Sequence, residues 1–306
     1  MGKLEEYIKN PFRLYWKLEK YMSFDWMSDE AFIRMKYHAA MGKKLNLKNP
    51  RTFQEKLQWL KLYDRNPLYT TLVDKQAVKE YVAVKIGDAY VIPTLGVWDS
   101  FDDIDFDVLP NQFVLKCTHD SGGLVIVTDK AEFDREAAKE KIETSLATDF
   151  YKVGREWPYK NVPHRIIAEQ YMIDDDLGEL KDYKFYCFNG EPKYLFIASD
   201  RNKGGQEVKF DYFDINFNRL QLKNAAHPNS TYDIKQPETF HEMIKIAAEL
   251  SSGIPQVRID LYEVNGHVYF GEYTFFSGGG WKPFDPEEYA YIWGEQIILP
   301  SSAKRK

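Results

Sequence analysis

The sequence VRIDLYEVNGHVYFGEYTFFSGGG at residues 257–280 predicts a β-hairpin that ends in a glycine-rich loop. Asn-Gly is the strongest short turn signal, and β-branched and aromatic residues flank it on both sides. Side chains alternate along a strand, so Arg258 and Asp260 share one face of the first strand, and Glu272 and Thr274 share one face of the second. Two acids and an arginine are costly to bury in apolar strands unless they have partners. This hairpin is therefore a candidate site.

The register of the hairpin makes a specific prediction. A two-residue Asn-Gly turn with regular pairing would place Asp260 opposite Gly271 and turn Glu272 to the other face. The two carboxylates can face each other only if the returning strand carries one extra residue, so we predict a β-bulge there. Facing carboxylates would suit Mg²⁺, which prefers one or two carboxylates together with phosphate oxygens. The alternative is a pair of edge-strand acids in solvent.

A glycine-rich loop follows the hairpin directly. It consists of Ser277, Gly278, Gly279 and Gly280. Backbone N–H groups of such a loop can bind an anionic group of a substrate. A tight exit turn is the alternative.

A second glycine loop lies upstream, between apolar strands expected at residues 113–117 and 124–127. It contains Ser121, Gly122 and Gly123. A strand that carries Lys116 next to such a loop can clamp phosphates, because the lysine supplies charge and the glycines expose N–H groups. The chain has no GxxxxGK[ST] motif and a strand follows the loop, so this is no P-loop. An ordinary hairpin turn with an edge lysine is the alternative.

Two further segments are candidates for nucleotide contacts. Residues 165–172 predict an apolar strand, and the acids at 174–176 follow it, so exposed backbone could bind adenine and a carboxylate could bind ribose. A buried strand with an acidic loop is the alternative. A second Asn-Gly turn, at residues 189–190, predicts another hairpin. Lys184 near its start and Arg201 after its end could meet phosphate or pair with neighbouring aspartates.

Apolar spacing and capping residues assign the remaining segments. We expect the first ~70 residues to be mostly helical. The helices expected there and beyond open at 28–30 and cover 53–63, 74–82, 131–148 and 237–250, and a further strand is expected at 90–94.

Length and composition restrict the class of protein. The chain has 306 residues, 44% of them hydrophobic and 29% charged, which is typical of a globular protein of about two domains. A net charge of −6 argues against broad nucleic-acid binding. Cys117 and Cys187 form no CxxC pair, which excludes a disulfide framework and a cysteine zinc site. No apolar run is long enough for a membrane span and the N-terminus lacks the apolar core of a signal peptide, so we expect a cytoplasmic protein.

The order of these motifs along the chain resembles the ATP-grasp superfamily, and most closely its TupA-like branch, which is named for teichuronopeptide biosynthesis. The resemblance runs from about residue 30 to 295 and is carried by segments 49–60, 115–123 and 271–275. It implies an α+β fold in which two α+β subdomains clamp ATP. The implied division is an N-terminal helical region (1–72), a small lid subdomain with its leading helix (73–172) and a large subdomain with the metal site (173–306).

The resemblance also implies roles for individual residues. The phosphates of ATP would be bound by Lys75, Lys116, Ser121, Gly122 and Gly123. The adenosine would be bound by Glu169, Gln170, Tyr171 and Met172, with Asp174 or Asp176 on the ribose. Mg²⁺ would be held by Asp260, Glu272 and Thr274, although the superfamily commonly has asparagine at the last position and a hydroxyl is a weaker ligand. Catalysis would fall to Arg258, Lys184 and Arg201, and the substrate would contact Ser277, Gly278, Gly279 and Gly280.

The activity implied is that of an ATP-dependent carboxylate–amine ligase with an acyl-phosphate intermediate. It would attach an amino acid or amine to a uronic-acid sugar in capsule or exopolysaccharide biosynthesis. Phosphoryl transfer depends on positioning and charge, so the absence of an evident nucleophile–base pair is expected. Two alternatives remain. One is a glycosyltransferase that binds a nucleotide-sugar through DxD patterns at residues 103–105 and 174–176, and the other is a binding module of the same fold without activity.

Overall fold

The structure is a computed structural model that describes residues 24–174, 180–199, 208–223 and 227–301. The helices in this part of the chain are α3 (Asp29–Met41), α4 (Phe53–Tyr63), α5 (Leu68–Val73), α6 (Ala77–Ile86), α7 (Arg135–Leu146), α8 (Phe150–Gly154), α9 (Phe240–Ser251) and α10 (Glu288–Gln296). The strands are β1 (Thr94–Trp98), β2 (Phe113–Cys117), β3 (Leu124–Val127), β4 (Ile166–Gln170), β5 (Lys181–Phe188), β6 (Glu191–Ser199), β7 (Lys209–Asp214), β8 (Gln256–Val264) and β9 (His267–Thr274). No helix within these residues is both long and apolar enough to cross a bilayer.

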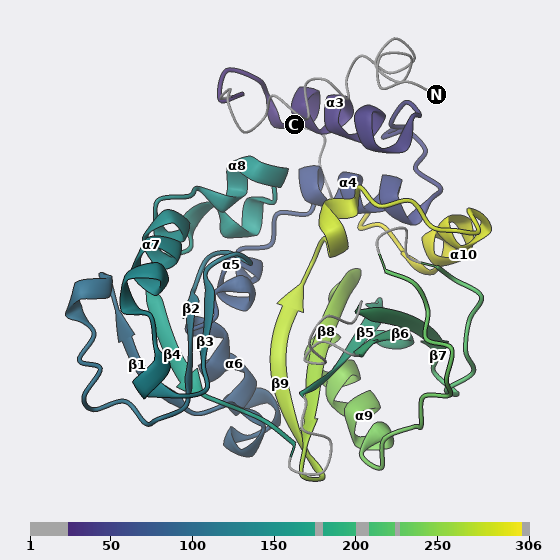
Figure 1. The fold of residues 1–306 in the computed structure, drawn as a ribbon. Helices are drawn as coiled ribbons and strands as arrows, with labels where there is room; N and C mark the ends of the chain where they lie inside the picture. The colour runs from purple at the N-terminus through teal and green to yellow at the C-terminus, as the bar shows by residue number, and fades with distance from the viewer. Residues whose placement is uncertain (1–23, 175–179, 200–207, 224–226, 302–306) are drawn as a thin grey trace.

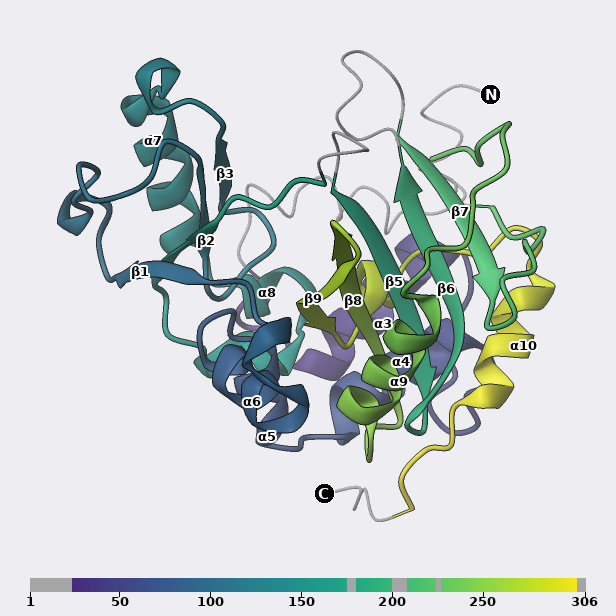
Figure 2. The ribbon, with the colours of Figure 1, turned by 90° about the horizontal axis from the view of Figure 1, so that it is seen from below.

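The strands form two separate antiparallel sheets, so the fold is α+β as expected. The small sheet has the order β1-β4-β2-β3, and the large sheet has the order β7-β6-β5-β8-β9. The two sheets lie side by side, with α5 and α6 near the gap between them, and α3 and α4 lie together at one end of the molecule (Figures 1 and 2).

The small sheet has one core face and one free face. Phe113, Leu115 and Cys117 of β2 are fully buried and pack with α7 in a core of their own. The intervening residue Lys116 therefore points to the other face, toward the large sheet. Strict alternation in β2 thus determines which side of the small sheet can bind a ligand.

The large sheet is covered differently on its two faces. Helix α9 packs on the face of Phe185, whose ring lies 5.9 Å from that of Phe240. On the opposite face, Trp293 of α10 packs against Tyr186 at 4.7 Å and stacks on Tyr194 at 4.6 Å. Because α10 covers only part of this second face, the rest of it is open to the candidate site.

Both predicted Asn-Gly hairpins are confirmed. Asn189 and Asn265 have φ of 51°, and the glycines that follow have φ of 85° and 74°, the left-handed conformation that this turn requires. The predicted bulge is also present: Leu261 pairs with Phe270, and Asp260 pairs with Glu272. Gly271 is the extra residue, and the two carboxylates face each other across β8 and β9.

The helix predictions are right in existence and differ at the ends. Helix α4 matches its prediction and starts with a capping box between Thr52 and Glu55. Helix α6 begins at Ala77 rather than residue 74, because the side chain of Asp74 caps it. The strand expected at residues 90–94 is wrong, since β1 begins only at Thr94. A 3-10 turn ends at Tyr90, and the following proline at position 93 has no N–H to donate to a ladder.

Candidate active site

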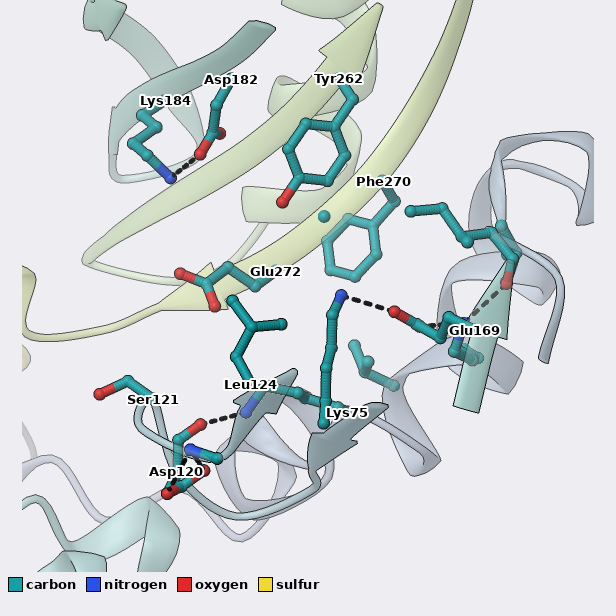
Figure 3. Close-up of a pocket in the computed structure, with 17 residues that line it drawn as sticks. Lys75, Asp120, Ser121, Leu124, Glu169, Asp182, Lys184, Tyr262, Phe270 and Glu272 are labelled. Carbon is teal, nitrogen blue, oxygen red and sulfur yellow. Dashed lines mark hydrogen bonds and ion pairs between the residues drawn. The ribbon is translucent and has the colours of Figure 1, made fainter. Parts of the chain in front are cut away.

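A cleft of about 290 Å³ lies between the two sheets. Its lining from the small-sheet side and the leading helix consists of Lys75, Val78, Lys79, Val91, Ile92, Lys116, Asp120, Ser121, Gly123, Leu124 and Glu169. Its lining from the large sheet consists of Asp182, Lys184, Tyr262, Phe270, Gly271 and Glu272. Figure 3 shows these two sets facing each other, with Lys75, Asp120 and Glu169 on one side and Lys184, Asp182 and Glu272 on the other. The predicted phosphate loop and Glu272 therefore line the same cleft.

The loop at 118–123 is held by its own aspartate. Asp120 accepts hydrogen bonds from the Gly123 N–H at 3.0 Å and from the Ser145 hydroxyl of α7. The ammonium of Lys75, at the start of the leading helix, donates to the backbone oxygen of Asp120. Burial lowers the pKa of Lys75, and the carboxylates of Glu272 and Asp120 oppose this effect only in part. Lys75 is therefore a partly buried lysine that is held against the loop.

Glu169 of β4 joins two lysines on the same side of the cleft as the loop. Its oxygens form ion pairs with Lys116 and Lys79, each at 2.5 Å. Burial would raise the pKa of Glu169, but these two ammonium groups hold it below its usual value. Lys116 and Glu169 are both among the nucleotide-binding residues predicted from the sequence. Lys79 is not among them; it lies on α6, four residues after Lys75.

The other residues expected near adenosine lie elsewhere or outside the described residues. Gln170, Tyr171 and Met172 follow Glu169 in the chain and are not part of the cleft lining. Asp174 is buried and accepts a hydrogen bond from the Asn265 N–H at 2.9 Å, so its carboxylate contacts the turn between β8 and β9. Asp176 and Arg201 fall outside the residues that the structure describes.

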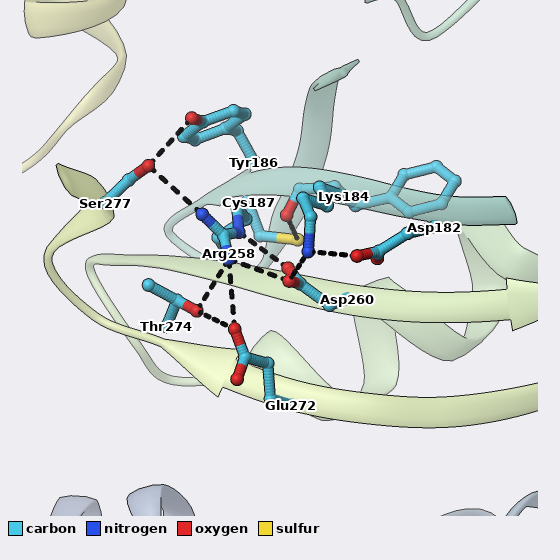
Figure 4. Close-up of polar contacts among 10 residues, drawn as sticks. Asp182, Lys184, Tyr186, Cys187, Arg258, Asp260, Glu272, Thr274 and Ser277 are labelled. Atoms are coloured by element: carbon cyan, nitrogen blue, oxygen red, sulfur yellow. Dashed lines mark hydrogen bonds and ion pairs between the residues drawn. The ribbon is translucent and has the colours of Figure 1, made fainter. Parts of the chain in front are cut away.

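The acids of the large sheet surround a buried guanidinium (Figure 4). Arg258 donates through Nε and Nη2 to the two oxygens of Asp260, at 2.6 and 2.7 Å. The same Nη2 reaches Glu272 at 3.1 Å and Thr274 at 2.9 Å. Lys184 forms ion pairs with Asp260 and, at 2.5 Å, with Asp182. Two cations and three carboxylates thus form one network on the open face of the sheet.

The protonation state of Asp260 follows from this network. Its side chain is fully buried, which would raise the pKa, but Arg258 and Lys184 hold the pKa below its usual value. Asp260 is therefore a carboxylate whose charge is balanced from within the protein.

The oxygen donors of Asp260, Glu272 and Thr274 are of the type that binds Mg²⁺, but they differ in how accessible they are to a metal ion. Asp260, Glu272 and Thr274 offer three oxygen donors on one face, the ligand type that Mg²⁺ prefers. Within the described residues, no group of three or more histidine, cysteine, aspartate or glutamate side chains is arranged to hold a metal ion. Both oxygens of Asp260 already accept hydrogen bonds from Arg258, whereas 43% of the Glu272 side chain is exposed. Glu272 would thus be the more accessible of the two carboxylates to a metal, and Asp260 would bind one in exchange for its bonds to arginine.

The glycine loop after β9 forms a tight turn beside this network. Gly278, Gly279 and Gly280 have φ of 57°, 66° and 69°, a conformation that disfavours other residues. The Ser277 hydroxyl lies 3.2 Å from Arg258 Nη1 and 2.9 Å from the Tyr186 hydroxyl. The predicted substrate loop is therefore in contact with the predicted catalytic arginine.

Side chains from distant helices hold this loop from behind, and sequence patterns gave no sign of them. Lys61 and Gln58 of α4 donate to the Gly279 carbonyl at 2.9 and 3.0 Å. Only the folded chain brings these residues to the site.

The DxD patterns are not part of the cleft. Asp103 and Asp105 are exposed beyond β1, and Asp105 accepts a hydrogen bond from the Asp107 N–H. The second pattern begins with Asp174, which binds a backbone N–H, and continues outside the described residues. Among the described residues of the two patterns, Asp103, Asp105 and Asp174 therefore contribute nothing to the lining of the cleft.

Comparisons with known proteins identify a family and several similar structures. A sequence model of the family described as TupA-like ATPgrasp matches residues 55–298. Similar solved structures include D-alanine–D-alanine ligase from Bacillus anthracis complexed with ATP (16% identity, 67% of this chain and 55% of that chain, TM-score 0.39). They also include D-alanine–D-alanine ligase from Helicobacter pylori (14%, 82% and 70%, TM-score 0.43) and a RimK domain protein ATP-grasp from Sphaerobacter thermophilus DSM 20745 (11%, 78% and 71%, TM-score 0.43). The chain spans little more than half of the B. anthracis ligase. No curated protein matches the chain in sequence.

The family match and the two antiparallel sheets confirm the predicted α+β ATP-grasp fold. Since the family model covers most of its length, the chain belongs to the TupA-like ATP-grasp family.

Proposed function

We propose that the protein is an ATP-dependent carboxylate–amine ligase. The reaction would transfer the γ-phosphoryl group of ATP to a carboxylate, and an amine would then displace phosphate from the acyl phosphate to give an amide. The observation that carries the proposal is the cleft between the sheets, which has a volume of about 290 Å³. Lys75 and Lys116 line one side of it, and Glu272 lines the other. Such a reaction needs positioned charge rather than a covalent nucleophile.

ATP would lie in this cleft, between a small subdomain (73–172) and a large one (173–306) that follow an N-terminal helical region (1–72). We assign the phosphates to Lys75, Lys116 and the loop of Ser121, Gly122 and Gly123, of which Ser121 and Gly123 line the cleft. Glu169 would meet the adenine amino group. The assignments of Gln170, Tyr171 and Met172 to adenine, and of Asp174 or Asp176 to ribose, rest on the resemblance alone.

The acid network would hold Mg²⁺ and orient the reacting groups. Glu272, with Asp260 and Thr274, would bind the metal, which neutralises phosphate charge when bound. Arg258 would stabilise the transferred phosphoryl group, since its guanidinium lies between these acids and Ser277. Lys184 lines the cleft beside Glu272 and would contact the transferred phosphoryl group. We propose the same role for Arg201.

The substrate carboxylate would lie at the loop of Ser277, Gly278, Gly279 and Gly280, next to Arg258. We propose a uronic-acid sugar of a capsule or exopolysaccharide as the carboxylate and an amino acid or amine as its partner. The reaction consumes ATP, so the proposal places the protein in the cytoplasm. The family name and the acidic network, not a bound sugar, support this substrate class.

Trapping with hydroxylamine tests the proposal. Hydroxylamine intercepts an acyl phosphate as a hydroxamate, so purified protein with ATP, Mg²⁺, glucuronic acid oligomers and hydroxylamine should release ADP and form hydroxamate in equal amounts. The R258A variant should form neither product, whereas K245A, on the far face of α9, should match the wild type. If ADP is released but none of the carboxylates supplied gives a hydroxamate, the ligase assignment is contradicted.

A further inference from the structure

A second pocket, of about 490 Å³, opens on the same face of the large sheet as the acid network. Its lining residues are Phe53, Gln54, Lys184, Tyr186, Phe196, Phe210, Tyr212, Lys223, Arg258, Ser277, Gly278, Gly280, Lys282, Pro283 and Phe284. Lys184 lines both this pocket and the interdomain cleft. The second pocket therefore adjoins the place where the transferred phosphoryl group would lie.

Register explains why the two pockets meet at Lys184. Tyr212, Phe196, Lys184, Asp260 and Glu272 are neighbours in one row across β7, β6, β5, β8 and β9. The row is aromatic at the β7 end and acidic at the β9 end. A ligand on the aromatic end would thus place its reactive group over the lysine and the acids.

The floor of this pocket is built of aromatic rings. Phe196 lies 5.4 Å from Tyr212 and 6.1 Å from Tyr186, centre to centre, and Phe53 stacks on Phe284 at 5.5 Å. The guanidinium of Arg258 lies 5.6 Å from the Phe196 ring. Flat apolar surface beside polar groups suits a ring with an apolar face and polar edges, such as a sugar.

The charge of the lining is entirely positive. It contains Lys184, Lys223, Arg258 and Lys282 and no carboxylate. Acids on the same sheet balance Lys184 and Arg258, but among the described residues no acid forms an ion pair with Lys223 or Lys282. These two lysines leave a surplus of positive charge that favours an anionic ligand.

The two surplus lysines belong to segments that meet at the pocket. The Lys223 N–H donates to the Asp285 carbonyl at 2.7 Å, which joins its segment to the one that carries Lys282. The aliphatic stem of Lys282 lies against Gly278, since a Cβ placed there would be 3.0 Å from the lysine Cδ. A reacting carboxylate at Arg258 and Ser277 would leave both ammonium groups for another part of the ligand.

We infer that this pocket binds an acidic saccharide that carries a second negative group besides the carboxylate that reacts, and that Lys223 and Lys282 hold this second group. The inference rests on the proposed function for the identity of the reacting carboxylate. The second group is an anion of the same ligand, either the carboxylate of a neighbouring sugar acid or a phosphate on the same sugar.

Calorimetric titration without ATP distinguishes these sources. The probes are trigalacturonic acid against maltotriose, and glucuronic acid 1-phosphate against glucose 1-phosphate, with galacturonic acid as the single-charge reference. We expect at least one acid with more than one anionic group to bind more tightly than the reference and than its counterpart without a carboxylate, with an affinity that falls as salt rises. The K223A/K282A variant should weaken that binding about tenfold, as the loss of two exposed ion pairs predicts, whereas K245A should not change it.

The inference is overturned if neither acid binds more tightly than galacturonic acid, or if K223A/K282A binds like K245A. Melting temperature with ATP and Mg²⁺, measured on the same samples, reports separately on the proposed function. A nucleotide shift without any preference for acidic saccharides rejects this inference alone. A preference for acidic saccharides without a nucleotide shift supports the pocket and rejects the ligase proposal.

Discussion

Replacement of Asp260 by alanine should destabilise the protein even when no metal or nucleotide is present. Asp260 is fully buried and binds two buried cations, Arg258 and Lys184. Removing one partner of a buried ion pair costs about 3–5 kcal/mol. The lower end applies here, because Lys184 keeps Asp182 at 2.5 Å and Arg258 keeps Glu272 at 3.1 Å.

This cost translates into a measurable shift in melting temperature. An unfolding entropy of ~2.1 cal/mol/K per residue gives about 0.6 kcal/mol/K for 306 residues, so about 3 kcal/mol lowers Tm by ~5 °C. Differential scanning calorimetry in EDTA measures the shift without metal. The matched control is E272Q, a half-exposed acid of the same network, which should lower Tm by less than ~2 °C.

A Tm for D260A within ~1 °C of the wild type in EDTA would refute this reasoning. Asp260 would then be a carboxylate without a structural function in the metal-free protein, and the bonds from Arg258 would contribute nothing measurable to stability.

Three further predictions concern the cleft. Gly123→Ala should destabilise the protein by about 1–3 kcal/mol in chemical denaturation, because its Cβ would lie 2.5 Å from buried side chains of β2 and α7. Gly122→Ala, whose Cβ would have only a 3.4 Å contact, should be nearly neutral, and equal losses would contradict the packing argument. Gly271→Ala should lower stability and weaken Mg²⁺-dependent nucleotide binding together in calorimetric titration, since its Cβ would lie 2.9 Å from the Tyr262 ring at the bulge. The pKa of Glu169 lies below its ordinary value of 4.5. Its ion pairs therefore stabilise the folded protein above pH 4.5, and this stabilisation is lost as the pH falls through the pKa that Glu169 has in the folded protein. The Tm difference between wild type and Glu169→Gln should therefore shrink below about pH 4, and a constant difference from pH 7 to pH 3 would argue against the ion pairs.

Local sequence signals were sufficient for the parts of the fold that depend on short-range chemistry. The Asn-Gly turns and the alternation in β2 and β8 are encoded within a few residues, so their positions were predictable. The bulge at Gly271 was predictable as well, because only one register lets Asp260 and Glu272 face each other. The strand expected at residues 90–94 was not, because its apolar pattern does not reveal that a 3-10 turn ends at Tyr90 and that β1 begins only at Thr94.

Roles that depend on long-range packing could not be obtained from the sequence. Lys79 reaches Glu169 only because α6 lies against β4, and Lys61 reaches the glycine loop only because α4 packs beneath it. Neither contact leaves a pattern in the chain. The bidentate bond of Arg258 to Asp260 is a further example, because strand alternation places both on one face but does not determine their distance.

Calorimetric titration of ATP with Mg²⁺ into wild type, K116A and K245A tests the central claim most directly. The account predicts that ATP binds the wild type and K245A with equal affinity and binds K116A at least tenfold more weakly, because Lys116 faces the cleft and Lys245 does not. ADP should compete with ATP for this site. UDP-glucose should not compete. Equal ATP affinity for all three proteins, or stronger binding of UDP-glucose than of ATP, would contradict the assignment of the cleft as a nucleotide site.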